Sequence, residues 1–547
     1  MPAQIQGLMM DYPLTLHPLL ERAAKLFPAK RISSRSGASM HRYTYAEFHS
    51  RTHRLAHTLA ALGIQPGERV GTLCWNTYRH LELYFAVPCF GAVLHTLNLR
   101  LAPDQLAYII NHAGDQVIFV DASLAPLIDQ IRAEIPGVRR VVLIGEGDDG
   151  GEYETLLASA PAQPYAWPDL DEKTACAICY TSGTTGHPKG VLFTHRSLVL
   201  HTFGLAMTDS FGLCERDVVL QVVPMFHANG WGLPYAAIMV GADIVFLGHH
   251  LQPEDIATAI QNERITMSGG VPTIWMGLYS LLERQPYDLS SLRLLVCAGS
   301  ALPRQFIELF AHKHGIRITL AWGMTETTPI ATVMTLRKDM ETLPDAAKFD
   351  IQARHGIPVA GVEVRIVDAN GQELPWDGFT MGELQTRGLW VTSGYYNDPR
   401  GGIEDNQESF MDGWFRTGDV ATIDANGYIQ IMDRTKDLVK SGGEWISSVD
   451  LENLLMGHPK VKEAAVIAVF HPKWEERPLA CIVPLPEYCD QLTKEEILAY
   501  LAPRVAKWWL PDDVVFIEAV PKTSVGKFNK RALRDQFKDY KLPGTGA

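Results

Sequence analysis

The sequence predicts an α/β fold in which a large N-terminal domain with several sheets is followed by a small α+β domain. Short apolar runs rich in Val, Ile and Leu alternate with amphipathic helical patterns, which is typical of largely parallel sheets covered by helices. The chain has 547 residues, more than one hydrophobic core usually supports, so at least two domains are expected. Its 46% hydrophobic and 20% charged residues are typical of a folded globular protein.

The N-terminal part of the chain contains the clearest helix and strands. Residues 17–27 place Leu20, Ala23, Ala24 and Phe27 at helical spacing, so an amphipathic helix is expected there. Buried strands are expected at the β-rich runs that follow it. These runs are residues 69–75, 117–120, 141–145, 242–248 and 293–300.

The character of the sequence changes near residue 433. Residues 425–447 are rich in charge and glycine, which makes this stretch a candidate hinge. Beyond it, short apolar runs are separated by two helical patterns, enough for an α+β domain of about 100 residues. The expected strands are residues 464–470, 479–485 and 514–521, and the expected helices are residues 449–458 and 494–509.

Composition argues against several classes of protein. The formal net charge of −13 disfavours a protein that binds nucleic acid by neutralising a polyanion. Residues 1–14 lack the basic and apolar regions of a signal peptide, and no later stretch reaches about 18 uncharged apolar residues. We therefore expect no transmembrane segment and a cytoplasmic protein.

The eight cysteines predict no metal site. Cys176 and Cys179 form the only C-x-x-C pair, and they lie in an apolar run that is typical of a buried strand. No second cysteine pair or histidine pair is spaced to complete a zinc site. Core thiols in a reducing compartment are the expected state.

One loop carries the strongest functional signal. TSGTTGHPKG, residues 181–190, follows an apolar strand and combines three glycines, four hydroxyl side chains and a lysine. Glycines let the backbone approach an anion, amides and hydroxyls donate to phosphate oxygens, and the lysine adds a positive charge. The loop lacks the Gly-Lys-Ser/Thr ending with which a P-loop holds magnesium. We predict a phosphate-binding loop formed by Thr181, Ser182, Gly183, Thr184, Thr185, Gly186 and Lys189.

Five further motifs follow this loop. They are PMFHANGW (224–231), AWGMTE (321–326), GWFRTGD (413–419), DRTKDLVKSGGEWIS (433–447) and PKTSVGK (521–527). In this order, and together with the loop, they resemble the adenylate-forming superfamily of acyl-CoA synthetases, luciferases and peptide-synthetase adenylation domains. The variants PMFHANGW and SGGEWISSVDLE are most similar to bacterial medium- and long-chain fatty acyl-CoA ligases, with methylmercaptopropionate-CoA ligases close by.

The resemblance implies a two-step reaction. A carboxylate attacks the α-phosphorus of ATP to give acyl-AMP and pyrophosphate, and the thiol of coenzyme A then displaces AMP. Such chemistry needs positioning and charge neutralisation more than a covalent nucleophile from the protein. ATP, Mg²⁺ and coenzyme A would therefore supply the reactive groups.

The resemblance also implies which residues hold ATP. The loop would bind the pyrophosphate, and Thr181 and Glu326 match the magnesium contacts of the family. Asp419 matches the carboxylate that binds the ribose, and Arg434 matches a further ribose and phosphate contact. The adenine pocket and its flanking positions correspond to Gly299, Ser300, Ala301, Trp322, Gly323, Met324 and Thr325.

Two lysines match positions with catalytic roles in the family. Lys527 matches the lysine of a mobile domain that reaches the carboxylate and the α-phosphate during adenylation. Lys436 matches the residue about which that domain rotates between the two half-reactions. The implied division is an AMP- and acyl-binding domain at 1–433, a hinge at 434–436 and a mobile domain at 437–547.

The acid and coenzyme A sites are implied by fewer residues. His227 matches a position that borders the carboxylate and the pantetheine exit, Trp231 matches a gate over the acyl tunnel, and Gly299 would also face the acid. The coenzyme A positions are Lys440, Gly443 and Trp445. Acetyl-CoA synthetases commonly carry a basic residue where this chain has Trp445, so the contacts to the phosphates of coenzyme A stay open.

Each matched residue also has a structural alternative. Trp231 could be core packing, His227 a buried hydrogen-bonded histidine, Glu326 a surface or capping carboxylate, Asp419 part of an Asx turn, and Lys527 a solvated lysine. The motif context favours the functional role for each of them.

The choice of acid stays open at this level. A medium- or long-chain fatty acid is favoured, with 3-methylmercaptopropionate and short-chain or aryl acids as alternatives. Apolar pockets discriminate one methylene by only about 1–3 kcal/mol, so the sequence does not specify a chain length. A homodimer is implied by the similarity to long-chain ligases.

Three other functions use the same motifs. An enzyme that loads a carrier protein would be expected to lie beside a serine-bearing carrier segment, and none follows residue 527. Nothing specifies the light emission of a luciferase-like oxygenase. An acyl-adenylate-binding protein without turnover is disfavoured because Lys189, Glu326 and Lys527 are all present.

Overall fold

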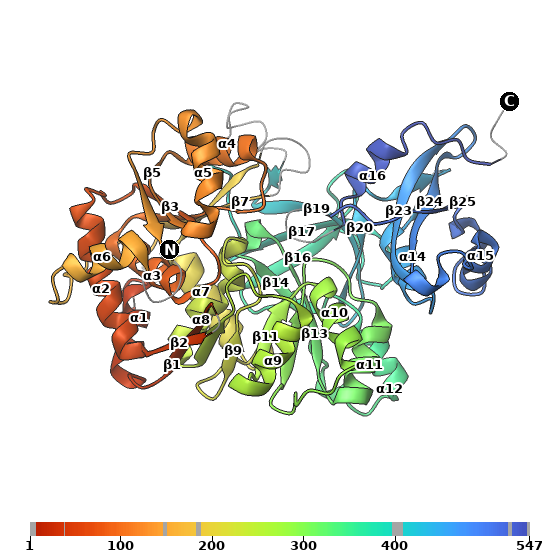
Figure 1. Ribbon diagram of the computed structural model, residues 1–547. Coiled ribbons are helices and arrows are strands. Elements are labelled where there is room, and N and C mark those ends of the chain that lie inside the picture. Colours follow the sequence, from red (N-terminus) through yellow and green to blue (C-terminus); the bar gives the residue numbers. More distant parts are fainter. Residues whose placement is uncertain are drawn as a thin grey trace.

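Four β-sheets organise the protein, whose structure is a computed structural model (Figure 1). It describes residues 7–37, 39–145, 150–181, 188–396, 409–442, 444–522 and 528–543. Two largely parallel sheets and one antiparallel sheet lie in the N-terminal part, and the fourth sheet lies in the C-terminal part. The predicted α/β class, with a large multi-sheet domain and a small α+β domain, is confirmed.

The largest sheet has nine strands in the order β15-β14-β13-β12-β11-β9-β10-β1-β2. They are β1 (Arg31–Ser36), β2 (Ser39–Thr44), β9 (Val218–Leu220), β10 (Asp243–Phe246), β11 (Met267–Gly270), β12 (Leu294–Cys297), β13 (Ile318–Gly323), β14 (Ile330–Val333) and β15 (Ile357–Pro358). The pairs from β1 to β13 are parallel, whereas β2, β14 and β15 add antiparallel edges. The strands predicted at 242–248 and 293–300 are confirmed as β10 and β12.

The second sheet has six strands in the order β6-β5-β3-β4-β7-β8. They are β3 (Arg69–Leu73), β4 (Val93–Thr96), β5 (Asp115–Asp121), β6 (Arg140–Ile144), β7 (Ala175–Tyr180) and β8 (Gly190–Thr194). All pairs are parallel except β7 with β8. The three strands predicted between 69 and 145 are confirmed, and Cys176 and Cys179 are buried free thiols in β7 as expected.

Helices cover both parallel sheets. They are α1 (His17–Leu26), α2 (Tyr45–Ala61), α3 (Tyr78–Phe90), α4 (Pro103–Ala113), α5 (Ala125–Ile131), α6 (Gly151–Ser159), α7 (His195–Ala206), α8 (Leu233–Val240), α9 (Pro253–Glu263), α10 (Pro272–Leu282), α11 (Arg304–His314) and α12 (Asp345–Gln352). The predicted helix at 17–27 is confirmed as α1, with Leu20 and Ala23 buried. Every residue of α3 is buried, and its Glu82 is neutralised by Arg51 of α2 at 2.6 Å. One core cluster joins α2, α3, α7 and α8 to strands of both sheets.

The third sheet, which is antiparallel, closes the N-terminal part. It contains β16 (Val362–Val367), β17 (Gly382–Gly388), β18 (Phe410–Met411), β19 (Trp414–Ile423) and β20 (Ile429–Arg434). Its long strands β19 and β20 extend toward the C-terminal part (Figure 1). The motif GWFRTGD therefore begins one residue before β19 and forms the first six residues of that strand.

The C-terminal part forms its own sheet and its own cores. The sheet contains β21 (Val439–Ser441), β22 (Glu444–Ile446), β23 (Val461–His471), β24 (Glu475–Pro484) and β25 (Asp513–Phe516), and the helices are α14 (Ser448–Met456), α15 (Lys494–Leu501) and α16 (Lys530–Gln536). Two hydrophobic clusters here contain only residues beyond 438. The predicted strands at 464–470 and 479–485 and the helix at 449–458 are confirmed, and β25 forms the first part of the stretch 514–521.

The predicted helix at 494–509 is wrong beyond Leu501. The helix α15 ends there, and only a short 3₁₀ turn at Lys507–Trp509 continues the pattern. The cause is Pro503, because its nitrogen carries no hydrogen to donate to the carbonyl of Ala499 and continue the helix, although Ala502 before it still has helical backbone angles. None of the helices within the described ranges combines the length and the apolar character needed to cross a membrane.

Candidate active site

The predicted nucleotide positions gather at the carboxyl ends of parallel strands. Gly299 to Ala301 follow β12, Trp322 and Gly323 end β13, and Thr181 follows β7. β12 and β13 belong to the nine-stranded sheet and β7 to the six-stranded one, and open α/β sheets bind ligands at the carboxyl ends of such strands. Gly323 is required by close packing, because a Cβ atom there would lie 1.8 Å from the carbonyl oxygen of Pro329. The backbone is thereby held tightly where the adenine pocket is predicted.

Asp419 and Trp322 come together across 97 residues of sequence. The indole Nε1–H of Trp322 donates to Oδ2 of Asp419 at 2.8 Å, and both side chains are buried. Arg434 lies opposite Asp419 in the β19–β20 ladder, and its Nε is 2.6 Å from the other carboxylate oxygen. The structure therefore brings the predicted ribose residue, its arginine and the predicted adenine-pocket tryptophan together in one cluster.

Glu326 is a buried carboxylate close to two positive charges. It lies in the 3₁₀ turn Thr325–Thr327, and its Oε1 accepts a hydrogen bond from the hydroxyl of Tyr395 at 2.7 Å. Burial raises the pKa of Glu326, while the Tyr395 hydroxyl, Arg434 and Lys189 oppose this rise. The alternative role of Glu326 as an exposed surface carboxylate is therefore wrong.

The two ends of the predicted phosphate loop are joined by hydrogen bonds. The backbone N–H of Thr181 donates to the carbonyl of Lys189 at 2.9 Å, and the N–H of Lys189 donates to the Thr181 hydroxyl at 3.2 Å. The ammonium group of Lys189 lies 4.6 Å from the centre of the Tyr395 ring. Of the predicted loop residues, Ser182, Gly183, Thr184, Thr185 and Gly186 lie outside the described residues.

Tyr395 is a candidate site residue that the sequence reasoning missed. It contacts both Glu326 and Lys189, which are 69 and 206 positions away in the chain. The neighbouring stretch LWVTSGYY has no polar pattern that predicts chemistry. Only the folded arrangement reveals this contact.

The predicted acid site contains an unusual backbone. Ala228, Asn229 and Trp231 all adopt left-handed conformations with φ of 35°, 45° and 58° in the turn Ala228–Gly232. The Trp231 side chain is buried, and its ring packs over Gly269 of β11, where an added Cβ atom would approach to 3.2 Å. His227 is half-buried directly before this turn. The burial of Trp231 agrees with both of its predicted roles, core packing and a gate.

The remaining predicted positions lie around the junction of the two parts. Lys436 is exposed between β20 and β21, and Lys440 and Trp445 face each other in the β21–β22 hairpin. Of the adenine-pocket positions, Thr325 is buried, Met324 and Ala301 are half-buried and Ser300 is exposed. Gly443 and Lys527 lie outside the described residues.

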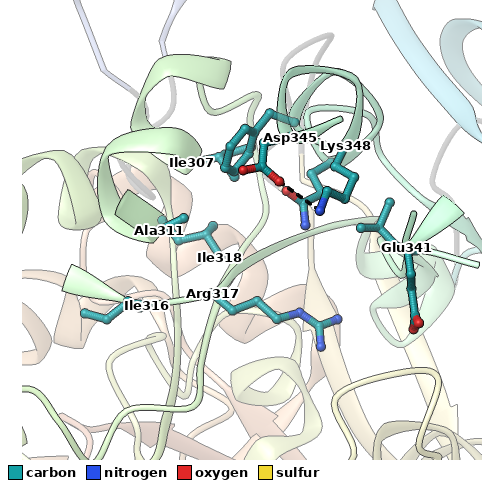
Figure 2. A pocket seen from close by; sticks show the side chains of 12 residues that line it. Ile307, Ala311, Ile316, Arg317, Ile318, Glu341, Asp345 and Lys348 are labelled. Carbon is teal, nitrogen blue, oxygen red and sulfur yellow. Dashed lines mark ion pairs between the residues drawn. The ribbon is translucent and has the colours of Figure 1, made fainter. Parts of the chain in front are cut away.

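A pocket of about 420 Å³ lies elsewhere, between α11, α12 and the start of β13 (Figure 2). Arg317 and the ion-paired Asp345 and Lys348 line it together with apolar side chains such as Ile307 and Phe349. It is at the amino end of β13, whereas Trp322 and Gly323 are at the carboxyl end, about 16 Å along the strand. This pocket is therefore separate from the predicted nucleotide site.

One group of side chains has the composition of a metal site, but the hydrogen bonds of its His53 leave neither ring nitrogen available to a metal ion. Glu21, His49 and His53 have ligand atoms within 4.8 Å of one another. The backbone N–H of Tyr165 donates to Nδ1 of His53 at 2.8 Å, so the hydrogen of the neutral ring is on Nε2. That Nε2 lies 3.1 Å from Glu21, to which it donates. We interpret the group as a hydrogen-bonded cluster.

Comparisons with known proteins agree with this arrangement. The model of the AMP-binding enzyme family matches residues 20–396, and that of the AMP-binding enzyme C-terminal domain matches residues 450–527. The chain is 48% identical to the long-chain-fatty-acid–CoA ligase of Thermus thermophilus, over 97% of each chain. It is 44% identical to the 3-methylmercaptopropionyl-CoA ligase of Ruegeria lacuscaerulensis, over 97% of this chain and 99% of that one.

Two further proteins extend the similarity. The medium-chain-fatty-acid–CoA ligase of Ectopseudomonas oleovorans is 41% identical, over 99% of each chain. Among solved structures, the anthranilate CoA ligase AuaEII in complex with anthranoyl-AMP has a TM-score of 0.84 at 26% identity, covering 96% of this chain and 98% of that one. The similarity spans both parts of the chain described above.

Proposed function

This chain belongs to the AMP-binding enzyme family and is an AMP-forming acyl-CoA ligase, and we propose that its acid is a medium- or long-chain fatty acid. The observation that supports the nucleotide chemistry is the cluster of Trp322, Asp419 and Arg434, with Glu326, Lys189 and Tyr395 as a second group. The fatty acid is supported by the long- and medium-chain relatives and by the buried Trp231.

The proposed reaction has two steps. A carboxylate oxygen of the acid forms a bond to the α-phosphorus of ATP, and the bond from that phosphorus to pyrophosphate breaks. The sulfur of coenzyme A then bonds to the acyl carbon, AMP leaves, and the thiol proton passes to solvent. Asp419 would accept hydrogen bonds from the ribose hydroxyls, and Lys189 and Arg434 would neutralise phosphate charge.

We propose Thr181 and Glu326 as the protein's ligands for Mg²⁺. Both offer oxygen atoms, which this cation prefers. The buried Glu326 is close to the charge of Lys189, and the backbone of Lys189 is hydrogen-bonded to Thr181. When bound, Mg²⁺ would neutralise the charge that develops on the leaving pyrophosphate.

We propose that residues 437–547 move relative to residues 1–433 about a hinge at 434–436, centred on Lys436. This division is supported by β20 ending the third sheet at Arg434 and by β21 beginning the fourth at Val439. Separate hydrophobic clusters on the C-terminal side also support it. Rotation would bring Lys527 to the α-phosphate in one arrangement, and Lys440, Gly443 and Trp445 toward coenzyme A in the other.

The proposal is tested by measuring pyrophosphate release with ATP, Mg²⁺ and coenzyme A over a panel of acids. The panel contains straight-chain acids from acetate to stearate, 3-methylmercaptopropionate and benzoate. A maximum of kcat/KM at medium or long chains is expected. A maximum at 3-methylmercaptopropionate or at a short or aryl acid would keep the ligase reaction and overturn the fatty-acid assignment.

Trp231→Ala is expected to change the preference for acyl chain length. Removing the indole would open space beside Gly269 and raise kcat/KM for acids longer than the wild-type optimum about fivefold or more. Trp275→Ala is the matched control, because the buried Trp275 ring packs on the next glycine of the same strand, Gly270. An unchanged chain-length profile in Trp231→Ala would show that Trp231 is core packing and not a gate.

We propose that the protein is a cytoplasmic homodimer in which a second copy covers the N-terminal segment. All eight cysteines are free, as expected in a reducing compartment. Leu8, Met9 and Met10 are 99%, 90% and 92% exposed, a large apolar surface for one short segment. Changing all three to serine is expected to convert dimers to monomers in sedimentation experiments. A wild-type protein that is already monomeric at micromolar concentration would contradict the homodimer.

A further inference from the structure

Residues 392–396 connect the two groups that are proposed to hold the phosphates and the metal. At one end, the N–H of Thr392 donates to the backbone carbonyl of Glu326 at 2.8 Å. At the other end, the N–H of Tyr396 donates to the carbonyl of Gly190, directly after Lys189, at 2.8 Å. The segment therefore fixes the end of the phosphate loop relative to the turn that carries Glu326.

Tyr395 lies between these two anchors and contacts both charged side chains. Its hydroxyl donates to Oε1 of Glu326 at 2.7 Å, and its ring lies under the ammonium group of Lys189, 4.6 Å from the ring centre. One aromatic side chain thus contacts a carboxylate through its hydroxyl and a cation through its face. Both contacts depend on the same rotamer.

We propose that Tyr395 is a positioning residue that orients Glu326 toward Mg²⁺ and Lys189 toward the phosphates of ATP. The inference rests on the proposed function, because that function gives Glu326 its role toward Mg²⁺ and Lys189 its role toward ATP. Tyr395 itself is assigned no contact with the substrate. The inference also goes beyond the family motifs used above, none of which includes Tyr395.

The physical reason is the opposite charge of the two side chains. Lys189 and Glu326 attract each other across a site where water is largely excluded around Glu326. If they paired directly, each would satisfy the other and neither would be directed at the nucleotide or the metal. The Tyr395 hydroxyl occupies Oε1 and its ring holds the ammonium group, so both charged groups keep a defined direction.

The two contacts can be separated by two substitutions. Tyr395→Phe removes the hydrogen bond to Glu326 and keeps the ring under Lys189. Tyr395→Leu removes both contacts. Tyr396→Phe is the matched control, because it deletes the hydroxyl of the next tyrosine in the chain. The Tyr396 ring faces His112, with ring centres 5.7 Å apart.

The readout is the affinity for α,β-methylene ATP, measured by calorimetry with and without Mg²⁺. Tyr395→Phe is expected to raise the Mg²⁺ concentration for half-maximal enhancement of nucleotide affinity about tenfold or more, and to leave affinity without Mg²⁺ unchanged. Tyr395→Leu is expected to weaken binding without Mg²⁺ as well, by about twofold to fivefold. Tyr396→Phe should match the wild type in both conditions.

A double-substitution cycle tests the route of the effect. In a Glu326→Gln background, Tyr395→Phe is expected to cause no further loss of Mg²⁺ dependence, because the carboxylate that it orients is gone. In steady-state assays, Tyr395→Phe alone should have a lower apparent affinity for Mg²⁺ than the wild type. Its kcat at saturating Mg²⁺ should stay within about threefold of the wild-type value.

Several outcomes would overturn the inference. They are equal Mg²⁺ dependence in Tyr395→Phe and Tyr396→Phe, an equal loss of affinity with and without Mg²⁺, or a full further loss in the Glu326→Gln background. Melting temperatures check folding, and Tyr395→Phe carries the test if Tyr395→Leu does not fold. Failure of the proposed function is distinguishable, since it would appear as a wild-type protein that releases no pyrophosphate with any acid.

Discussion

Asp419→Asn is expected to weaken AMP binding about 50-fold, because it removes the charge from the buried carboxylate that we propose as the ribose ligand. Asparagine still offers an oxygen to the indole N–H of Trp322, but it loses the charge-assisted contact with Arg434 and the ribose hydroxyls. Calorimetric titration with AMP measures the effect, and acid-dependent pyrophosphate release should fall in parallel. The free energy of unfolding should fall by about 1–2 kcal/mol, a modest value because the Arg434 side chain is 44% exposed.

The same hairpin offers a control for this substitution. Asp424 lies in the turn between β19 and β20, pairs with Arg354, and accepts backbone hydrogen bonds from Asn426 and Tyr428. Asp424→Asn therefore makes the same chemical change in the same pair of strands, at the end away from Trp322. It should leave the dissociation constant of AMP unchanged. If Asp419→Asn and Asp424→Asn bind AMP equally well, Asp419 does not contact the nucleotide.

The elements predicted best are those whose pattern is set by local burial. The apolar runs at 117–120 and 175–180 became β5 and β7 because strands buried on both faces have continuous apolar sequences. The helical pattern at 494–509 misled because its periodicity continues through Pro503, where the backbone cannot follow it. Periodicity reports which faces are buried, and the proline decides where the helix ends.

The candidate site was predictable only where its residues belong to contiguous motifs. Trp322 and Asp419 were identified separately, and they meet where the end of β13 in the nine-stranded sheet contacts β19 of the antiparallel third sheet. Tyr395 was not predictable, because its hydrogen bond to Glu326 depends on how residues 392–396 cross between two other elements. The roles of Lys527 and of the loop residues 182–186 stay predictions, since these residues lie outside the described ranges.

Lys527→Ala is expected to reduce acyl-AMP formation about a hundredfold to a thousandfold and to spare thioester formation from supplied acyl-AMP. A positive group at the α-phosphate stabilises charge that develops only in the adenylation transition state, and losses of this size are typical when one such group is removed. The two half-reactions are measured separately, by exchange of labelled pyrophosphate into ATP and by conversion of synthetic acyl-AMP to acyl-CoA. A similar loss in both half-reactions would contradict a role of Lys527 that is confined to adenylation.

A lysine of the same motif makes this prediction specific. Lys522 is the second residue of PKTSVGK, directly after Pro521. It is ion-paired with Glu463 at 2.6 Å. Lys522→Ala removes an equal charge five positions away and should leave both half-reactions within about twofold of the wild-type rate. If Lys522→Ala slowed adenylation as much as Lys527→Ala, general electrostatics of the C-terminal part would explain the loss. A selective loss in Lys527→Ala is the result expected if the proposed movement about the hinge at 434–436 brings this lysine to the α-phosphate in one arrangement and takes it away in the other.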